Sequence, residues 1–428
     1  MLIFTNNFIS KIIMAKIHIY TYVLFIPFLF FGQTQEVVPP DYIKTVIFTG
    51  ETPESQLPII RLGDRIALEF DALNGNEEDF YYKIEHYDYD WTPSNLTKAE
   101  YMSGYDNQRI RNYENSFNTY QIYSHYNLII PNERTRGLIK SGNYMIHIYN
   151  DYDELVFSRK FMLYENNANV GVFVRTSRDV KYLAQKQTVD ININSTNIQF
   201  NNPSETVKAL IVQNNNLNTA ISNVKPQYTM GNELIYKYTS ETSFWGGNEY
   251  LAFENKDVKG ANVAIQYIEL ADLYNNFLFT DIVRANRPYT YNPDINGNFV
   301  INALDTERPW IEADYVWIHF SLLPDPSLMN KSIYVYGNYN NYELTETNKM
   351  HFNKDRGVYE TQLLLKQGFY SYKYVVVDEK GGLQEGAVSG NFKETENNYK
   401  VLVYYRDLGA RYDRLIGVGE SNSVNITN

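Results

Sequence analysis

The side chains best suited to acid–base or metal chemistry are few in this sequence and lie far apart. There is no Cys, and beyond the first 32 residues no two His have the spacing of zinc ligands. Most of these His fall in aromatic, strand-like segments, where structural or surface roles are favoured. The sequence therefore predicts no metal site and no cofactor. The five imidazoles are those of His86, His125, His147, His319 and His351.

One segment has the spacing of a Ser nucleophile and its Lys base. Ser222 and Lys225 are three positions apart, but Pro226 follows directly and places the segment in a loop. The accessory Ser-Asp-Asn and Lys-Thr-Gly elements of such enzymes are absent from the sequence. We interpret the spacing as chance and expect no enzymatic activity.

A second segment is similar to the start of a calcium-binding loop. Asp294, Asn296 and Asn298 alternate as the first ligands would, but Phe299 occupies the place of the required Gly. The twelfth position holds Asp305 and not the bidentate Glu. A hairpin turn at Asn296-Gly297 is the better interpretation.

Aromatic residues dominate the rest of the chain and predict its fold class. The sequence has 39 Tyr and 23 Phe, many in alternating runs such as 80–87 and 370–376. Such residues suit the half-buried face of a pleated sheet, and almost no segment repeats with the helical period. We expect an all-β protein of three consecutive Ig-like or fibronectin-like β-sandwich domains with little helix.

Turn signals suggest where these domains meet. Asn150 to Asp153 reads as a hairpin turn, and Asn166-Asn167 as the first boundary. The predicted domains are an N-terminal sandwich at 33–166, a middle sandwich at 167–304 and a C-terminal sandwich at 305–428.

The first 32 residues have the pattern of a secretory signal peptide. Lys11 and Lys16 precede an apolar stretch from Ile17 to Phe31, and the small residue Gly32 follows. Translation starts at Met1 or at Met14, and an N-terminal membrane anchor is the alternative interpretation. No Cys follows the apolar stretch, and no later segment approaches the ~20 apolar residues of a membrane span, so neither a lipid anchor nor a transmembrane segment is expected after cleavage.

Net charge narrows the possible partners. The formal charge is -12, and removing residues 1–32, which carry two Lys and no acidic residue, makes it -14. Nucleic acid and anionic lipid are bound through basic patches, so both are disfavoured as partners.

Three aromatic residues are candidate anchors for a protein interface. Trp91 closes a strand, while Trp245 and Tyr250 flank the Gly246-Gly247 turn. Trp is enriched at interface hot spots. The alternative is that they pack in the core under a loop.

The third predicted domain resembles a glycogen-binding-type Ig-like module. The resemblance lies in segments 332–342 and 368–376, with Gly-Phe-Tyr-Ser-Tyr-Lys-Tyr in the second. It implies the fold. However, Tyr342 stands where the module has a Trp, and the second Trp has no counterpart, so we expect no glucan binding.

The whole chain after residue 36 resembles the plug protein family of the type IX secretion system. The resemblance lies in segments 82–94, 123–132, 141–144, 246–250 and 411–417, each a loose pattern by itself, and above all in their order. It implies a periplasmic, non-enzymatic protein that binds and seals the periplasmic opening of the outer-membrane translocon barrel. An exported carbohydrate-binding protein is the main alternative, and a hydrolase with an unrecognised acidic pair is the second.

Export is expected to remove the chain up to about Gly32, which leaves Gln33 at or near the new N-terminus, because the apolar stretch ends at Phe31. N-terminal sequencing of the protein from the periplasmic fraction measures this. An intact first segment retained in a membrane fraction would contradict it.

Overall fold

The computed structural model describes residues 34–50, 56–424 and 426, so the expected signal peptide lies outside the described residues. Strands dominate within these ranges, which confirms the predicted all-β class. The helices there are single turns, and none is long and apolar enough to cross a membrane. They are α2 (Lys98–Tyr101), α3 (Pro203–Thr206), α4 (Pro309–Glu312) and α5 (Gly386–Ser389), with 3-10 turns η1 (Val180–Tyr182), η2 (Pro326–Leu328) and η3 (Asn338–Asn340).

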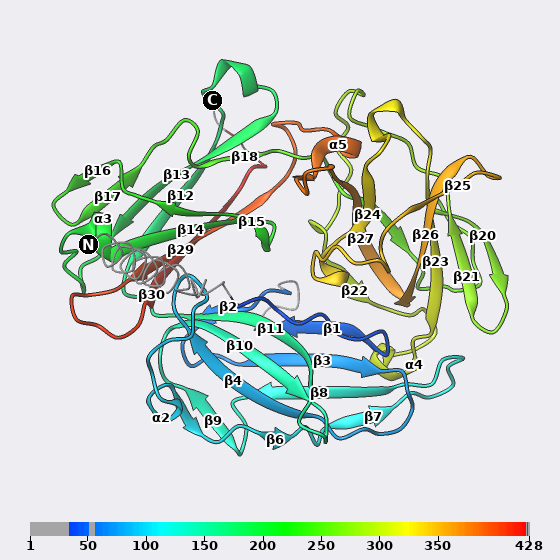
Figure 1. The fold of residues 1–428 in the computed structure, drawn as a ribbon, viewed down its shortest axis with the longest axis horizontal. Helices are drawn as coiled ribbons and strands as arrows, with labels where there is room; N and C mark the ends of the chain where they lie inside the picture. The colour runs from blue at the N-terminus through cyan, green and yellow to red at the C-terminus, as the bar shows by residue number, and fades with distance from the viewer. Residues whose placement is uncertain (1–33, 51–55, 425, 427–428) are drawn as a thin grey trace, which may run out of the picture. The chain divides into compact units, whose positions relative to one another are not determined.

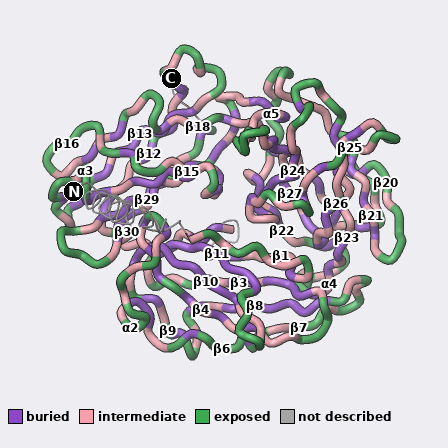
Figure 2. The backbone as a smooth tube through the Cα atoms, in the orientation of Figure 1, coloured by how far each residue is buried: buried purple, intermediate pink, exposed green. Residues whose placement is uncertain are grey.

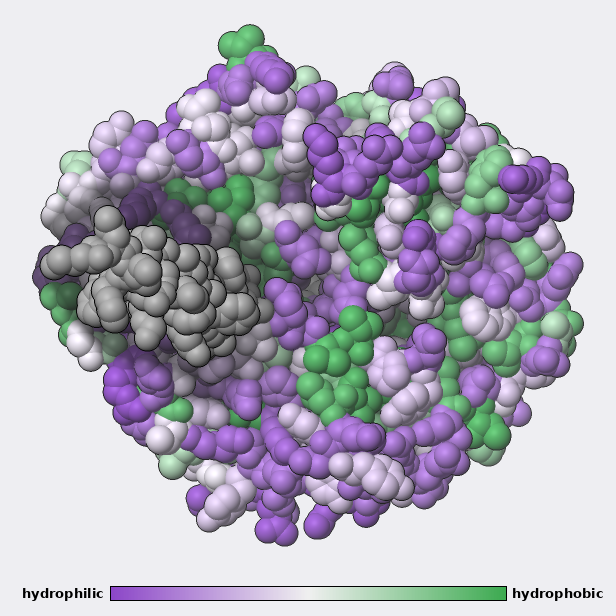
Figure 3. Space-filling view, viewed as in Figure 1, coloured by the Kyte–Doolittle hydropathy of each residue, from purple (hydrophilic) through white to green (hydrophobic). Residues whose placement is uncertain are grey.

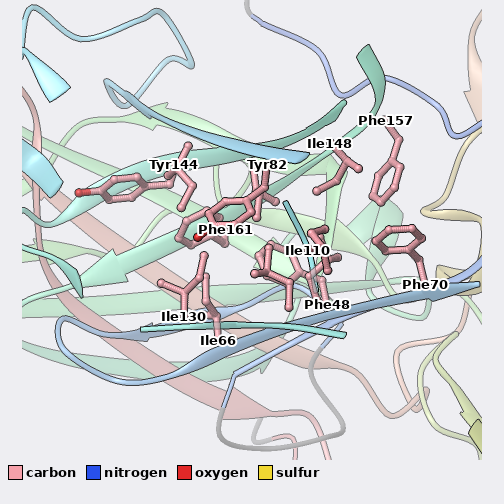
Figure 4. Packing of buried hydrophobic residues seen from close by; sticks show 14 of the residues in the cluster. Phe48, Ile66, Phe70, Tyr82, Ile110, Ile130, Tyr144, Ile148, Phe157 and Phe161 are labelled. Atoms are coloured by element: carbon pink, nitrogen blue, oxygen red, sulfur yellow. The ribbon is translucent and has the colours of Figure 1, made fainter. Parts of the chain in front are cut away.

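The first β-sandwich contains the N-terminal strands, drawn in blue and cyan in Figure 1. Its core is aromatic: the ring centre of Phe70 lies 5.1 Å from that of Phe80 and 5.2 Å from that of Phe157. Figure 4 shows Phe70 facing Phe157 in this core. One sheet has the order β1 (Ile43–Thr49), β3 (Ile66–Ala72), β8 (Ser124–Ile130), β7 (Tyr113–Asn115). The other has the order β2 (Ile59–Arg61), β11 (Leu155–Tyr164), β10 (Gly142–Tyr149), β4 (Tyr81–Tyr87), β6 (Gln108–Arg109), and β5 (Met102–Gly104) pairs separately with β9 (Thr135–Leu138).

The second sandwich combines strands from the middle and the end of the chain. One sheet contains β12 (Asn169–Thr176), β13 (Lys186–Asn194), β17 (Glu233–Tyr236) and β16 (Tyr228–Met230), with β18 (Ser243–Trp245) also paired to β13. The other has the order β15 (Asn216–Val224), β14 (Val207–Gln213), β29 (Asn398–Tyr405), β30 (Arg414–Asn422).

The third sandwich is inserted between β18 and β29 of the second. The predicted boundaries 167–304 and 305–428 are therefore wrong, since strands within 251–301 join the third sandwich and strands within 398–422 complete the second. In one half, β27 (Gly368–Val377) pairs with β19 (Leu251–Glu254), β22 (Phe299–Ile301), β24 (Ser332–Tyr336) and β28 (Leu383–Gln384). The facing sheet has the order β20 (Ile265–Leu270), β21 (Tyr274–Leu278), β23 (Tyr315–Leu322), β26 (Val358–Lys366), β25 (His351–Asn353).

The first and second sandwiches pack sheet on sheet. Along β10, Tyr144 and Ile146 enter the core of the first sandwich, while Met145 points the other way into a second cluster. That cluster also holds Leu402 and Tyr404 of β29. β10 and β29 are consequently buried on both faces, and both are purple along most of their length in Figure 2.

A buried ion pair joins the first and third sandwiches. Lys366 Nζ lies 2.7 Å from Asp71 Oδ2, and the two side chains are 1% and 0% exposed. The hydroxyl of Tyr315 and the Nδ1 atom of His125 each lie 2.7 Å from the same carboxylate. Burial alone would raise the pKa of Asp71, but the charge of Lys366 and the hydrogen bonds from His125 and Lys366 outweigh it and hold that pKa below its ordinary value.

Replacing Lys366 by Met leaves the Asp71 carboxylate buried without its counter-charge. We expect the free energy of unfolding, measured by equilibrium denaturation, to fall by about 3–5 kcal/mol. The matched control is Lys225→Met, which breaks the exposed 2.8 Å pair with Glu205 and should cost less than about 1 kcal/mol. Equal losses in the two variants would show that the buried pair does not hold the sandwiches together.

Candidate interaction site between the second and third sandwiches

The three anchor residues expected from the sequence lie in different environments. Trp91 is 7% exposed and Tyr250 is 6% exposed, whereas Trp245 is 46% exposed. An anchor for an external partner needs free surface before binding. Of the three, Trp245 is the residue that offers it.

Trp91 packs inside the cluster that joins the first and second sandwiches. It lies in the left-handed region at φ 63°, and its N–H donates to the carbonyl of Asp88 at 3.0 Å. The ammonium of Lys160 lies 4.4 Å from its ring centre. The alternative interpretation made from the sequence, a core residue under a turn, describes this position.

Tyr250 lies where the chain enters the third sandwich. Its N–H donates to Asp294 at 2.5 Å, and the ammonium of Lys373 is 4.9 Å from its ring centre. The Asn296-Gly297 turn packs on it, and a Cβ on Gly297 would come within 2.7 Å of the ring. Positive φ at both turn residues, 53° and 80°, confirms a turn at Asn296-Gly297. It is not the predicted hairpin, because the strand that follows, β22, pairs with β27 and not with a strand just before the turn.

Trp245 belongs to an exposed aromatic and basic cluster at the edge of the second sandwich. Pairing of β18 with β13 places Lys186 opposite Trp245, and the Lys186 ammonium lies 4.4 Å from the Trp245 ring centre and 4.6 Å from that of Tyr182. The two rings meet edge to face at 5.3 Å. Lys181 adds a second ammonium 4.9 Å from Tyr182.

A cavity of about 580 Å³ opens beside this cluster, between the second and third sandwiches. Lys186 and Trp245 line one side, and Glu385 of the third sandwich lines the other. The lining is rich in amide side chains, among them those of Gln213 and Asn218. Amides both donate and accept hydrogen bonds, so the cavity suits a neutral polar chain such as a peptide backbone.

Two connecting segments, residues 246–250 and 390–397, carry the chain between the sandwiches and fix the cavity. The N–H of Phe392 donates to the carbonyl of Gly247 at 2.8 Å. A Cβ on Gly246 would come within 2.0 Å of the Phe392 carbonyl oxygen, so this approach requires Gly. Asn397 donates to the carbonyl of Gly246 at 2.8 Å and is buried.

Buried carboxylates lie at the same connection. Glu249 is 2% exposed and accepts hydrogen bonds from Tyr289 and from the N–H of Glu396. Burial raises the pKa of Glu249, and it raises the pKa of Asp294 to about 7 despite the backbone donors at Asn296 and Tyr250.

The side chain of Tyr342, at the position expected for a sugar-stacking residue, is buried and has no free ring face. Tyr342 is 3% exposed, and its hydroxyl donates to the carbonyls of Asn214 and Asn296 at 3.3 and 3.2 Å. Asn218 in turn donates to the carbonyl of Tyr342 at 3.0 Å. Residues of the second sandwich therefore cover Tyr342.

The other candidates from the sequence do not come together. Lys225 pairs with Glu205 on the surface and not with Ser222. His86 is held between Ser94 Oγ and the carbonyl of Ser141, and burial lowers its pKa. Among residues 34–50, 56–424 and 426, no group of three His, Asp or Glu side chains is placed to hold a metal ion.

Sequence reasoning missed Lys186, Tyr182 and the Asp71–Lys366 pair. Lys186 and Trp245 meet through the pairing of β13 with β18, which no local pattern indicates. Asp71 gave a weak signal, since a carboxylate directly after the strand-like segment 66–70, where Ile66, Leu68 and Phe70 alternate, suggests a buried partner.

Asp294→Asn should make stability depend less on pH. Since the folded pKa of Asp294 is about 7 and its ordinary value is 3.8, the folded chain retains the proton and its stability falls as pH rises through about 7. We expect a shallower fall in the unfolding free energy between about pH 4 and pH 7 in the variant. Denaturation at several pH values measures the slope, with the exposed Asp305→Asn as control. An unchanged slope would contradict the assignment.

Comparison with known proteins identifies the family. The family model for the type 9 secretion system plug protein 1st domain matches residues 43–165, which are the strands of the first sandwich. A crystal structure of a hypothetical protein from Parabacteroides merdae matches with a TM-score of 0.87 and 34% identity, over 91% of this chain and 99% of that one. No curated protein matches. With the first-domain match and this relative over nearly its whole length, the chain belongs to the type IX secretion system plug protein family.

Proposed function

We propose that this protein is a periplasmic, non-enzymatic plug that binds and seals the periplasmic opening of the type IX translocon barrel in the outer membrane. Membership of the plug family supports a role in this secretion system. The observation that carries the proposal is the exposed cluster of Trp245, Tyr182 and Lys186 on a body whose three sandwiches interlock. The protein would then bind the barrel through this exposed surface, without covalent chemistry.

A seal has to resist deformation, and the interlocking supports this. Sheet-on-sheet packing joins the first and second sandwiches, two connecting segments join the second and third, and the Asp71–Lys366 pair joins the first and third. Each sandwich is thereby held by both of the others. Relative motion would break buried contacts in at least two places.

The exposed surface suits a partner that leaves again. On the face shown in Figure 3, hydrophobic side chains form separate patches within a largely hydrophilic surface. Interfaces of this kind have aromatic anchors within a polar rim. Trp and Tyr tolerate water when the partner is absent, because each carries a polar group on its ring.

A row of aromatic side chains on the third sandwich does not favour the carbohydrate-binding alternative. Tyr267, Phe277 and His319 stack across β20, β21 and β23, with ring centres 4.2 and 4.0 Å apart and planes within 8° and 11°. Phe277 thus has a ring on each face. Stacking of a sugar needs a free ring face, and neither Phe277 nor the buried Tyr342 offers one.

Deleting the gene should make the outer membrane abnormally permeable through an open translocon. Uptake of a large antibiotic or dye is measured in the deletion strain, in a strain that also lacks the barrel, and after complementation. We expect uptake to rise in the first strain, and to return to normal in the other two. Unchanged uptake, or an equal rise without the barrel, would contradict the proposal.

A further inference from the structure

Two ammonium groups, that of Lys186 in the cavity lining and that of Lys181 in the nearby turn η1, have no carboxylate partner among the described residues. No Asp or Glu in the described parts of the chain lies within ion-pair distance of Lys181 or Lys186. The nearby carboxylates are already engaged. Asp179 accepts the backbone N–H of Lys181 at 3.0 Å, and Asp190 lies 2.9 and 3.7 Å from Arg175 and Arg178.

This basic site is unusual for the chain that carries it. The whole protein has a formal charge of -12. Lys181 in η1 and Lys186 at the start of β13 therefore form a basic patch on an acidic protein. Each ammonium lies over an aromatic ring, which fixes it and leaves its other side open to an anion.

Apolar side chains surround the two Lys. Val180 is 84% exposed, Leu183 44% and Trp245 46%. They belong to one surface, because a hydrogen bond joins the loop after η1 to the end of β18. The N–H of Gly246, the residue after β18, donates to the carbonyl of Gln185 at 2.8 Å. The amide-lined cavity of about 580 Å³ continues from this surface.

We propose that the surface formed by residues 180–186 and Trp245 binds an extended acidic segment of a protein partner. Carboxylates of the segment pair with Lys181 and Lys186, and an apolar side chain between them covers Trp245. The segment's backbone continues along the amides of the cavity. The inference rests on the proposed function only in that it takes the partner to be a protein.

Charge complementarity favours an acidic peptide over a lipid surface or a neutral ligand. An anionic lipid surface would meet the same two Lys, but it would also repel the rest of an acidic chain. A neutral ligand would leave both ammonium groups without a counter-charge. An acidic peptide satisfies both and reaches into the cavity, which a flat lipid surface does not.

The test titrates the full protein into a fluorescein-labelled short peptide of alternating Glu and Phe, and into the same peptide with Gln for Glu. Fluorescence anisotropy gives the affinity at low and high salt. We expect the acidic peptide to bind, salt to weaken it, and Lys186→Glu and Lys181→Glu each to weaken it roughly tenfold. Lys225→Glu, an exposed change elsewhere on the second sandwich, is the matched control and should bind as the unaltered protein does.

Several results would overturn the inference. They are no binding, equal affinity for the Gln peptide, or equal losses in Lys225→Glu and Lys186→Glu. Binding to phosphatidylglycerol vesicles that depends on Lys186, without peptide binding, would replace it with a lipid site. Thermal melting confirms that each variant is folded. If Lys186→Glu does not fold, Lys181→Glu, which lies in the exposed turn η1, carries the test. If the permeability test succeeds while the peptide does not bind, this inference fails and the proposed function stands.

Discussion

The pairing of β14 with β29 is the constraint on which the rest of the structure depends. Residues 207–213 of β14 pair with residues 399–405 of β29, nearly 200 positions later in the chain. The chain between β18 and β29 must therefore leave the second sandwich and return to it. This inserted segment forms the third sandwich. The same two strands supply Leu210 and Leu402 to the cluster on which the first sandwich packs.

This topology explains why the connection between the second and third sandwiches is the most distinctive part of the surface. Two segments cross there together, and their close approach requires Gly246. Buried carboxylates and amides occupy the space between them, and the Trp245 cluster lies at the rim. The Asp71–Lys366 pair joins the third sandwich to the first, away from the cavity.

The strands were predictable from the sequence, but their partners were not. The turns at Asn150–Asp153 and Asn296-Gly297 follow from local residue types, and the structure has both. Whether a strand near residue 400 joins the second or the third sandwich depends on contacts with distant residues. Composition could not separate the exposed Trp245 from the buried Trp91 for the same reason, because both lie next to turns and their exposure depends on what packs over them.

The central claim is that this chain binds the translocon barrel, and the most direct measurement is affinity purification of the tagged protein from detergent-solubilised outer membranes. The account predicts that the barrel co-purifies when no cargo is passing, and that Lys186→Glu recovers less of it than Lys225→Glu does. Recovery of the folded protein without the barrel, from membranes shown to contain it, would contradict the account.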